Sequence, residues 1–429
     1  MQVIHVSDTH LGRQEYGYEF RELDGYELFN KVVEDAIEEH IKLIVLSGDL
    51  FDEAKPRNRA LRTVVECFRR LREKGVKVVL IPGDHDYPRK RDILPLYVLD
   101  DIFDNVVLLG VPYGDGYRTE YVLESEKIAF YALPFTPFKT RIKKYLPRFL
   151  QTASNFFREH SGYKHVLLAH YSVKEYMPYD AVLSLSDIPC VTYAAFGHIH
   201  SRIKTMLPSG GLLAYPGSLD IYRRDEIQGW LKYGKGYNLV DLSIEPDPSM
   251  VEWINLDVRK QVLYRIKSSE LDSLYGIVER ELEGVTKKPI IIHLTVAAKT
   301  SERVNIARYI EKLSPSEVLI RHHIEYIDDE EKSIVSNGDE PVGYDEVEVL
   351  ARYMGVSREA AEIVYEIVEG IASNSLSREE IEEKILRLKE YIRKPVVGEE
   401  KTTSDKKAVD RKKRIEGIKK SLLEYLSSS

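Results

Sequence analysis

The sequence contains little cysteine and no long apolar run. Its 429 residues include only two cysteines, Cys67 and Cys190, which are too few for a disulfide framework or a cysteine zinc site. No stretch is apolar for long enough to cross a bilayer, and the first residues enter a strand pattern without a basic segment and an apolar run before it. We therefore expect neither a disulfide-stapled secreted domain nor a membrane protein, and we predict a cytoplasmic location.

The sequence also lacks an excess of positive charge. Lysine and arginine number 62 against 70 aspartates and glutamates, which gives a net charge of −8. Such a balance offers no general attraction for nucleic acids, but bound divalent cations would add positive charge at one place. Local clusters of basic residues, not the total, must therefore decide whether the protein binds a polyanion.

The length and the order of the patterns predict several domains. Apolar, β-branched runs alternate with amphipathic helical stretches up to residue 245, which is typical of an α/β domain. After a proline-bearing boundary, a helical pattern over 271–282 and strand patterns at 290–296 and 318–320 predict a small α+β domain. The predicted segments are 1–245, 246–327, a linker 328–343, helices in 344–393, a lysine-rich disordered stretch 394–414 and a short helix 415–429.

Polar blocks with metal-binding side chains follow five strand-like runs of the first domain. Continuous apolar runs predict strands buried on both faces, and the residues after parallel strands gather at one edge of a sheet. Carboxylates and imidazoles without thiolates suit Mn²⁺, Fe²⁺ or Zn²⁺, and a carboxylate such as Asp49 can bridge two cations. The blocks are Asp8-Thr9-His10, Gly48-Asp49, Gly83-Asp84-His85-Asp86, His170 and Gly197-His198-Ile199-His200.

Each block also has an ordinary structural explanation. An Asp-x-His sequence after a strand is more often a turn or a cap, and Gly-Asp is common in turns. A lone histidine such as His170 is more often hydrogen-bonded near a core. The Gly-His-x-His block is more specific, and the succession of five blocks behind five strand-like runs favours a two-metal site.

The order of these blocks resembles that of the calcineurin-like metallophosphoesterases, whose pattern is Asp-x-His, Gly-Asp, Gly-Asn-His-Asp/Glu, His and Gly-His-x-His. The resemblance implies a β-sandwich flanked by helices, an attack of water on phosphorus, and His85 as the catalytic residue that protonates the leaving oxygen or stabilises the transition state. It implies one metal held by Asp8, His10, Asp49 and His200, and a second held by Asp49, Asp84, His170 and His198.

Further motifs narrow the resemblance to one family of nucleases. The arginines with which related phosphatases clamp a monoester are missing after Asp49 and after His85, which favours a diester substrate. The segments 7–12, 48–52, 215–218 and 235–237 look like the nuclease subunit of the DNA double-strand-break repair complex, the meiotic-recombination-eleven family. That resemblance implies two Mn²⁺ per subunit, exonuclease action on duplex ends, endonuclease action on single strands, a homodimer, an ABC-type coiled-coil ATPase as partner, and a nucleoid-associated protein.

Two residues depart from the family pattern. Asp84 stands where the family has asparagine, so that an amide donor is lost and a negative charge is gained beside the expected phosphate. We expect an active site with altered metal preference. Asp52 stands where many relatives have histidine, which puts the strength and polarity of exonuclease action in question.

Basic clusters and apolar helix faces mark candidate surfaces for DNA and for proteins. The predicted DNA-binding residues are Arg57, Arg59, Arg89, Lys90 and Arg91, and a further basic cluster spans 139–148. Helical stretches 61–71 and 93–103 could form the dimer surface with Leu61, Leu71, Leu96, Leu99, Ile102 and Phe103, or these residues could face their own core.

The C-terminal helices are the predicted docking segment for the ATPase. Apolar residues recur at helical spacing between 347 and 392, including Leu350, Ile363, Ile367, Ile381, Ile385 and Leu388. The alternative is an independent helical bundle. For the whole chain, two alternatives stay open beside the nuclease: a phosphodiesterase for small nucleotides, and a weakly catalytic DNA-end tether in which Asp84 has silenced the metal site.

Overall fold

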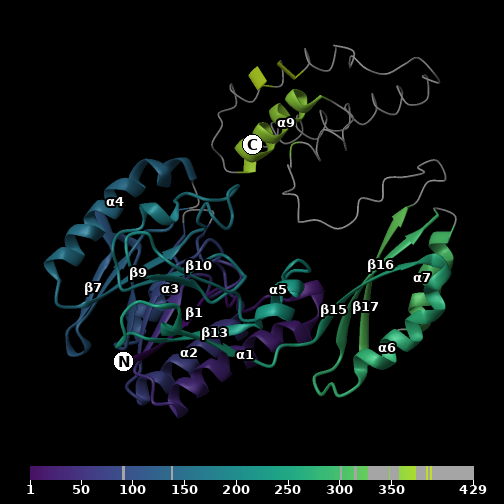
Figure 1. Ribbon diagram of the computed structural model, residues 1–429, viewed down its shortest axis with the longest axis horizontal. Helices are drawn as coiled ribbons and strands as arrows, with labels where there is room; N and C mark the ends of the chain where they lie inside the picture. The colour runs from purple at the N-terminus through teal and green to yellow at the C-terminus, as the bar shows by residue number, and fades with distance from the viewer. Residues whose placement is uncertain are drawn as a thin grey trace. The chain divides into compact units, whose positions relative to one another are not determined.

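The computed structural model describes residues 1–88, 92–136, 139–299, 302–313 and 316–326, and then 347, 357–372, 383–384 and 387–388. The chain divides into two units, Met1–Lys332 and Ser333–Ser429 (Figure 1). This division falls inside the polar stretch 328–343 that we predicted as a linker. The finer domain boundaries stay predictions.

Two six-stranded sheets form the centre of the first unit. The first sheet runs in the order β14-β13-β1-β2-β3-β4, with β1 (Gln2–Val6), β2 (Leu43–Ser47), β3 (Lys77–Ile81), β4 (Val106–Leu108), β13 (Gly236–Asp241) and β14 (Val251–Asn255). The second runs in the order β11-β12-β10-β9-β8-β7, with β7 (Glu120–Leu123), β8 (Ile128–Ala132), β9 (Lys164–His170), β10 (Tyr193–Gly197), β11 (Ile203–Met206) and β12 (Leu212–Tyr215). A short hairpin, β5 (Val111–Tyr113) and β6 (Gly116–Arg118), lies beside them.

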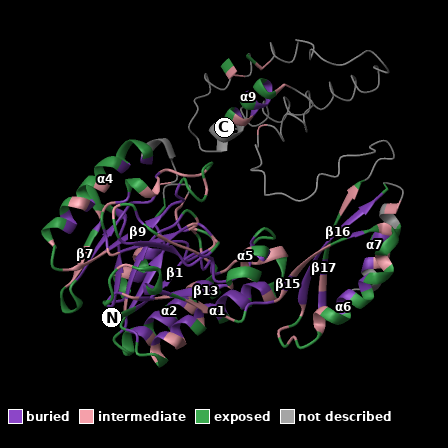
Figure 2. Cartoon of the chain, in the orientation of Figure 1, coloured by how far each residue is buried: buried purple, intermediate pink, exposed green. Residues whose placement is uncertain are grey.

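Alternate residues of these strands build three apolar layers. Val45 and Val79 from the first sheet meet Phe130 and Val166 from the second in the core between the sheets. The outer face of the first sheet packs against α1 (Glu19–Glu38), α2 (Asn58–Glu73) and α3 (Leu96–Ile102), and that of the second against α4 (Lys139–Glu159). Strands β2 and β10 are buried along their whole length, so the predicted burial on both faces is confirmed (Figure 2).

The direction of the strands fixes where the site must lie. Strands β1, β2 and β3 are parallel neighbours, and so are β8, β9 and β10. Their carboxyl ends therefore share one edge of each sheet, and the polar blocks that follow them meet there.

A small three-stranded sheet covers residues 261–326. Its strands β15 (Gln261–Lys267), β16 (Ile290–Ala298) and β17 (Val318–Tyr326) are all parallel, and α6 (Leu274–Leu282) and α7 (Arg303–Leu313) lie in the two connections. We predicted strands at β16 and β17 and a helix over 271–282, but neither β15 nor α7. The parallel βαβ order is more specific than the α+β arrangement that we expected. Arg259, which precedes β15, holds Asp24 of α1 through two bonds of 2.7 Å.

The apolar faces of α2 and α3 are mostly used inside the chain. Leu71, Leu96, Leu99 and Phe103 are buried in the core beneath these helices, so for these residues the alternative that they face their own core is confirmed. A helical apolar stripe has the same spacing whether it faces its own sheet or a partner. Ile102, by contrast, is 55% exposed.

The described part of the second unit contains α9 (Arg358–Ala372). Two of the apolar residues that we predicted to meet a partner, Ile363 and Ile367, are buried there. Leu350, Ile381 and Ile385 and the segments 394–414 and 415–429 lie outside the described residues.

A buried histidine gives the first unit a predictable acid sensitivity. His5 lies inside the sandwich, bonded to the Tyr193 hydroxyl at 2.7 Å and to Ser47 Oγ at 2.8 Å, and burial lowers its pKa to about 3. In the unfolded chain His5 binds a proton as the pH falls through about 6.5, whereas in the folded chain it stays neutral until the pH is close to 3. Stability therefore falls as the pH drops from 6.5 towards 3, by about 1.4 kcal/mol per pH unit from this group.

We expect His5→Gln to remove this contribution. The stability gap between wild type and variant should narrow as the pH falls from 6.5, measured by urea unfolding at a series of pH values. His323→Gln, at an exposed position, is the control. Parallel pH profiles for wild type and His5→Gln would contradict the prediction.

Candidate metal centre

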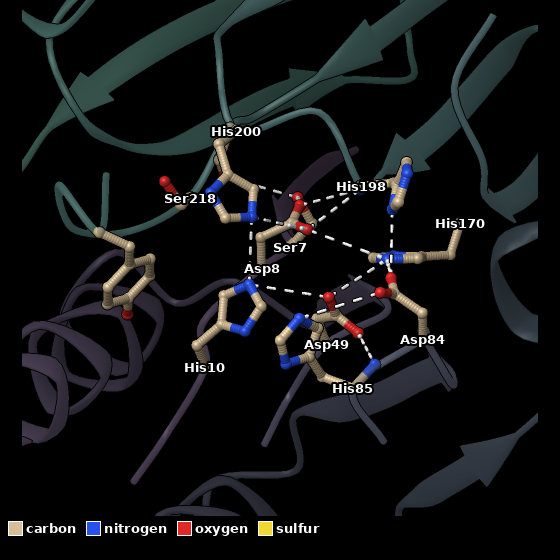
Figure 3. Close-up of polar contacts among 12 residues, drawn as sticks. Ser7, Asp8, His10, Asp49, Asp84, His85, His170, His198, His200 and Ser218 are labelled. Carbon is tan, nitrogen blue, oxygen red and sulfur yellow. Dashed lines mark hydrogen bonds and ion pairs between the residues drawn. The ribbon is translucent and has the colours of Figure 1, made fainter. Parts of the chain in front are cut away.

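All seven predicted metal ligands lie together at the carboxyl edge of the two sheets (Figure 3). Asp8 and His10 follow β1, Asp49 follows β2, Asp84 follows β3, His170 ends β9, and His198 and His200 follow β10. Asp8, His10, Asp49 and His170 are at most 2% exposed. Parallel strand ends therefore bring together side chains as distant in sequence as His10 and His200, which are 190 residues apart.

The cluster has two halves. In the first, His10 Nε2 lies 3.1 Å from His200 Nε2, and His200 Nε2 lies 3.8 Å from Asp8 Oδ1. In the second, Asp84 Oδ1 lies 3.1 Å from both His170 Nε2 and His198 Nδ1. Each trio offers three ligand atoms within 4.8 Å of one another, as a bound cation requires.

Asp49 lies between the halves. Its Oδ2 atom is 3.6 Å from His10 Nε2 in the first half and 3.3 Å from His170 Nε2 in the second. The other oxygen, Oδ1, accepts the backbone N–H of His85 at 2.9 Å. One carboxylate oxygen therefore faces both halves while the second is held by the protein.

Hydrogen bonds orient three of the imidazoles, and two of the partners were missed by the sequence analysis. His170 Nδ1 donates to the Ser47 carbonyl at 2.8 Å, which leaves Nε2 to face Asp84 Oδ1, 3.1 Å away. His198 Nε2 meets Asp180 Oδ2 at 2.6 Å, and His200 Nδ1 meets Glu226 Oε1 at 2.8 Å. Such carboxylates fix the tautomer and raise the basicity of a metal-binding histidine.

Glu226 is tied into a buried network. It begins α5 (Glu226–Tyr233), and its Oε2 accepts from Lys235 Nζ at 2.5 Å and from Ser218 Oγ at 3.0 Å. Burial alone would raise the pKa of Glu226, but Lys235 and His200 outweigh it and hold the pKa below its usual value. The carboxylate is thus kept charged behind His200.

The backbone around the cluster is strained. Asp8, His10, Asp49 and His198 have φ values of 52°, 43°, 53° and 91°, in the left-handed region that residues with a Cβ rarely adopt. Such conformations persist where the surrounding structure enforces them, and they collect at functional sites. Gly48 adopts the same backbone region without strain because it has no Cβ. A Cβ at this position would lie 2.1 Å from His170 Nδ1, which is too close for any other residue.

Asp86, the last residue of the Gly83–Asp86 block, joins two of the loops. Its fully buried carboxylate accepts the N–H groups of Leu50 at 3.3 Å, Phe51 at 2.9 Å and Gly83 at 3.0 Å. Burial and the nearby charge of Asp49 raise its pKa to about 7. Asp86 therefore fixes the loop of Asp49 against the loop of Asp84.

His85 stands beside the two ligand trios. Its Nδ1 donates to the carbonyl of Asp52 at 2.7 Å, and its Nε2 lies 3.8 Å from Asp84 Oδ2, on a side chain that is 37% exposed. Burial opposes protonation of His85, but the carboxylates of Asp49 and Asp84 outweigh it and raise its pKa. Asp52, the departure from the family pattern, thus positions His85 through its backbone.

The donor set fits two divalent cations. The centre brings together three carboxylates, Asp8, Asp49 and Asp84, none of which is more than 38% exposed. Negative charges this close repel one another unless cations lie between them. His10, His170, His198 and His200 each direct a ring nitrogen towards the same space. Carboxylate and imidazole donors are typical of Mn²⁺, Fe²⁺ or Zn²⁺ sites.

The predicted DNA-binding residues Arg57 and Arg59, at the start of α2, both form ion pairs with glutamates. Arg57 pairs with Glu22 at 3.1 Å and Arg59 with Glu19 at 2.8 Å. Arg89, Lys90 and Arg91 lie outside the described residues.

No helix among the described residues is long and apolar enough to span a membrane.

Comparison with known proteins gives the class first. Residues 1–202 match the family described as calcineurin-like phosphoesterase, so the predicted metallophosphoesterase fold and enzyme class are confirmed. The DNA double-strand break repair protein Mre11 of Sulfurisphaera tokodaii is 32% identical over 73% of this chain and 78% of its own length. The Mre11 protein of Saccharolobus solfataricus is 30% identical over 88% of this chain and 97% of its own length. The Mre11 protein of Aeropyrum pernix is 31% identical over 86% of this chain and 92% of its own length. The chain belongs to the Mre11 family of DNA double-strand break repair proteins.

Removing the charge behind His200 should weaken metal binding. We expect Mn²⁺ to raise the melting temperature of the wild type, because an ion that binds only the folded state at 100 times its Kd adds about 2.7 kcal/mol of stability. In Glu226→Gln, half of this stabilisation should require 10- to 100-fold more Mn²⁺, roughly the usual cost of losing such a carboxylate. Thermal unfolding across a Mn²⁺ titration measures the shift, with exposed Glu126→Gln as control. An unchanged titration in Glu226→Gln would contradict it.

Proposed function

We propose that this chain is a manganese-dependent nuclease that processes DNA ends in double-strand break repair, with exonuclease action on duplex ends and endonuclease action on single strands. The observation that carries the proposal is the position of Asp49 Oδ2, within 3.6 Å of one ligand trio and 3.3 Å of the other. A bridging carboxylate is what two adjacent cations need. Membership of the Mre11 family supports DNA ends as the substrate.

The chain's own residues have distinct roles in this proposal. Asp8, His10, Asp49 and His200 hold one cation, and Asp49, Asp84, His170 and His198 hold the other. When bound, the two cations supply Lewis acidity and activate water for attack on phosphorus. Asp180 and Glu226 orient His198 and His200, and His85 delivers a proton to the leaving oxygen or stabilises the charge on the phosphate.

The surroundings of the centre support a diester substrate. Arg13 lies beside the centre among the described residues, but its guanidinium is shared between Glu15 at 2.7 Å and Asp52 at 3.2 Å. An arginine so neutralised is poorly suited to clamp a phosphomonoester dianion. A diester carries a single negative charge and does not require such a clamp.

Cleavage of end-labelled DNA tests the proposal. With Mn²⁺, the wild type should degrade duplex ends and cut single strands, and EDTA should abolish both activities. Asp84→Asn restores the family asparagine and should keep the activity while changing the preference among Mn²⁺, Mg²⁺ and Zn²⁺. A wild type that leaves DNA intact, but cleaves it after Asp84→Asn, would instead favour the tethering alternative. Cleavage of small nucleotides alone would favour the small-nucleotide alternative.

The partner in this proposal is an ABC-type coiled-coil ATPase that docks on the helices of 344–393. Deleting residues 340–429 should abolish co-purification with the ATPase and leave basal cleavage of DNA unchanged, because the metal ligands all lie before residue 201. Affinity purification of the co-expressed pair measures this. Retention of the ATPase by the truncated chain would contradict the docking assignment.

We also propose that the chain forms a homodimer and acts in the cytoplasm at the nucleoid. The apolar side chains that α2, α3 and the preceding loop leave exposed support a dimer contact there. They are Val65, Ile93, Val98 and Ile102, with 37%, 73%, 49% and 55% exposure.

A further inference from the structure

The basic residues near the start of α2 and those of α4 differ in whether they form ion pairs. Near the start of α2, Arg57, Arg59 and Arg62 pair with Glu22, Glu19 and Glu66 at 3.1, 2.8 and 2.9 Å. On α4, Lys143, Lys144 and Arg148 are exposed, and none of them forms an ion pair with a described residue. The one acidic residue of α4 is Glu159, at its last position. Between the start of α2 and the described part of α4, the basic side chains without an ion pair to a described residue are therefore those of α4.

The unpaired cations of α4 point away from the sheet. Ile142 and Leu146 are buried against the second sheet, while Lys143, Lys144, Pro147 and Arg148 are exposed. At 100° per residue, the exposed positions occupy a single continuous arc opposite the buried pair. Figure 2 shows the outer side of α4 as largely exposed.

The beginning of α4 lies at the same edge as the metal centre. Strand β8, which precedes α4, is parallel to β9, and Leu133 N donates to the Leu168 carbonyl at 2.9 Å. Two residues further on, the ring of Phe135 lies 6.0 Å from the ring of His170, and α4 starts at Lys139. Since a helix rises 1.5 Å per residue, the basic face reaches about 14 Å from this starting point.

From this arrangement we infer that the outer face of α4 binds the backbone phosphates of the DNA strand that leaves the metal centre. The inference rests on the proposed nuclease function and names a binding surface for the same substrate. Lysine and arginine side chains on such a face contact phosphates without reading bases, so binding is independent of sequence. The positive face compensates locally for a chain whose net charge is −8.

The salt dependence of DNA binding tests this surface. Three phosphate contacts contribute a slope of about −2.7 to the plot of log affinity against log salt for duplex DNA, at 0.9 per contact. We expect the triple variant Lys143→Gln, Lys144→Gln, Arg148→Gln to lose up to this much of the wild-type slope, and to bind at least tenfold more weakly at low salt. Fluorescence anisotropy of a labelled duplex over a range of salt concentrations provides both values.

A second triple variant removes the same charge elsewhere. Lys31, Arg265 and Lys288 are each paired, with Asp35 at 2.5 Å, Glu325 at 2.6 Å and Glu317 at 2.5 Å. Changing these three to glutamine should leave the slope within one unit of the wild type. Equal losses in both triple variants would show that net charge alone is responsible and would overturn the inference, as would an unchanged slope in the α4 variant.

Hydrolysis of bis(p-nitrophenyl) phosphate with Mn²⁺ separates this inference from the proposed function. The small diester cannot reach along α4, so the α4 variant should hydrolyse it at the wild-type rate. Loss of both activities in the α4 variant would overturn the inference, because the substitutions would then act on the metal centre. A wild type that hydrolyses the small diester but neither binds nor cuts DNA would overturn the proposed nuclease function itself.

Discussion

Asp49→Asn is expected to lower metal-dependent DNA cleavage by at least 10³-fold, which corresponds to about 4 kcal/mol of transition-state stabilisation. The reason lies in how the two oxygens of Asp49 are used. Oδ1 accepts the N–H of His85 at 2.9 Å, and the asparagine oxygen will keep that bond. The amide NH₂ group then takes the place of Oδ2, between His10 and His170, where a donor cannot bind a cation.

This variant should bind metal more weakly but keep the fold of the wild type. Isothermal titration calorimetry should show weaker Mn²⁺ binding and a lower stoichiometry than in the wild type, while circular dichroism shows an unchanged fold. Asp104→Asn, an exposed aspartate before β4, changes the charge equally and should behave as wild type. If Asp49→Asn binds two Mn²⁺ per chain as tightly as the wild type and cleaves DNA, Asp49 does not bridge the cations.

The gathering of the predicted metal ligands at one edge was predictable because their positions follow from strand direction. Apolar runs that bury both faces identify the strands, and parallel strands place their carboxyl ends together. Asp8, Asp49, Asp84 and His170 could therefore be assigned to one edge without knowledge of any distance. The structure adds that they form two trios around Asp49.

The residues behind the ligands were not predictable in this way. Asp180 lies in the long connection after β9 and Glu226 begins a helix, so neither comes directly after a strand end or recurs at a diagnostic spacing. Their contacts with His198 and His200 depend on how distant loops pack. Strand β15 was missed for a related reason, because Tyr264 and Arg265 interrupt its apolar run.

The dimer surface shows where a correct periodicity was insufficient. The stripe on α2 and α3 was correctly recognised as apolar, yet Leu71 and Leu99 face their own sheet. Periodicity reports that a face is buried, but it does not report what buries it. Only the packed structure separates these residues from the exposed Val98 and Ile102.

His85→Gln is expected to lower DNA cleavage by roughly 10² to 10⁴-fold, the usual contribution of a positioned proton donor, without loss of bound metal. His85 lies beside the ligand trios, and because Nδ1 is bound to the Asp52 carbonyl at 2.7 Å, Nε2 is the nitrogen that faces Asp84, 3.8 Å from its Oδ2. Glutamine matches the size of the side chain but cannot donate a proton to an alkoxide. Cleavage rates and calorimetric Mn²⁺ binding, compared with His322→Gln at an exposed position, measure the two effects.

The leaving group distinguishes proton donation from a structural role of His85. A DNA strand leaves as an alkoxide that needs a proton, whereas p-nitrophenolate is stable without one. We therefore expect His85→Gln to slow hydrolysis of bis(p-nitrophenyl) phosphate far less than cleavage of DNA, so that the ratio of the two rates changes by at least tenfold. An equal loss on both substrates would mean that His85 stabilises the phosphate or the metal loops, because those roles serve every leaving group alike.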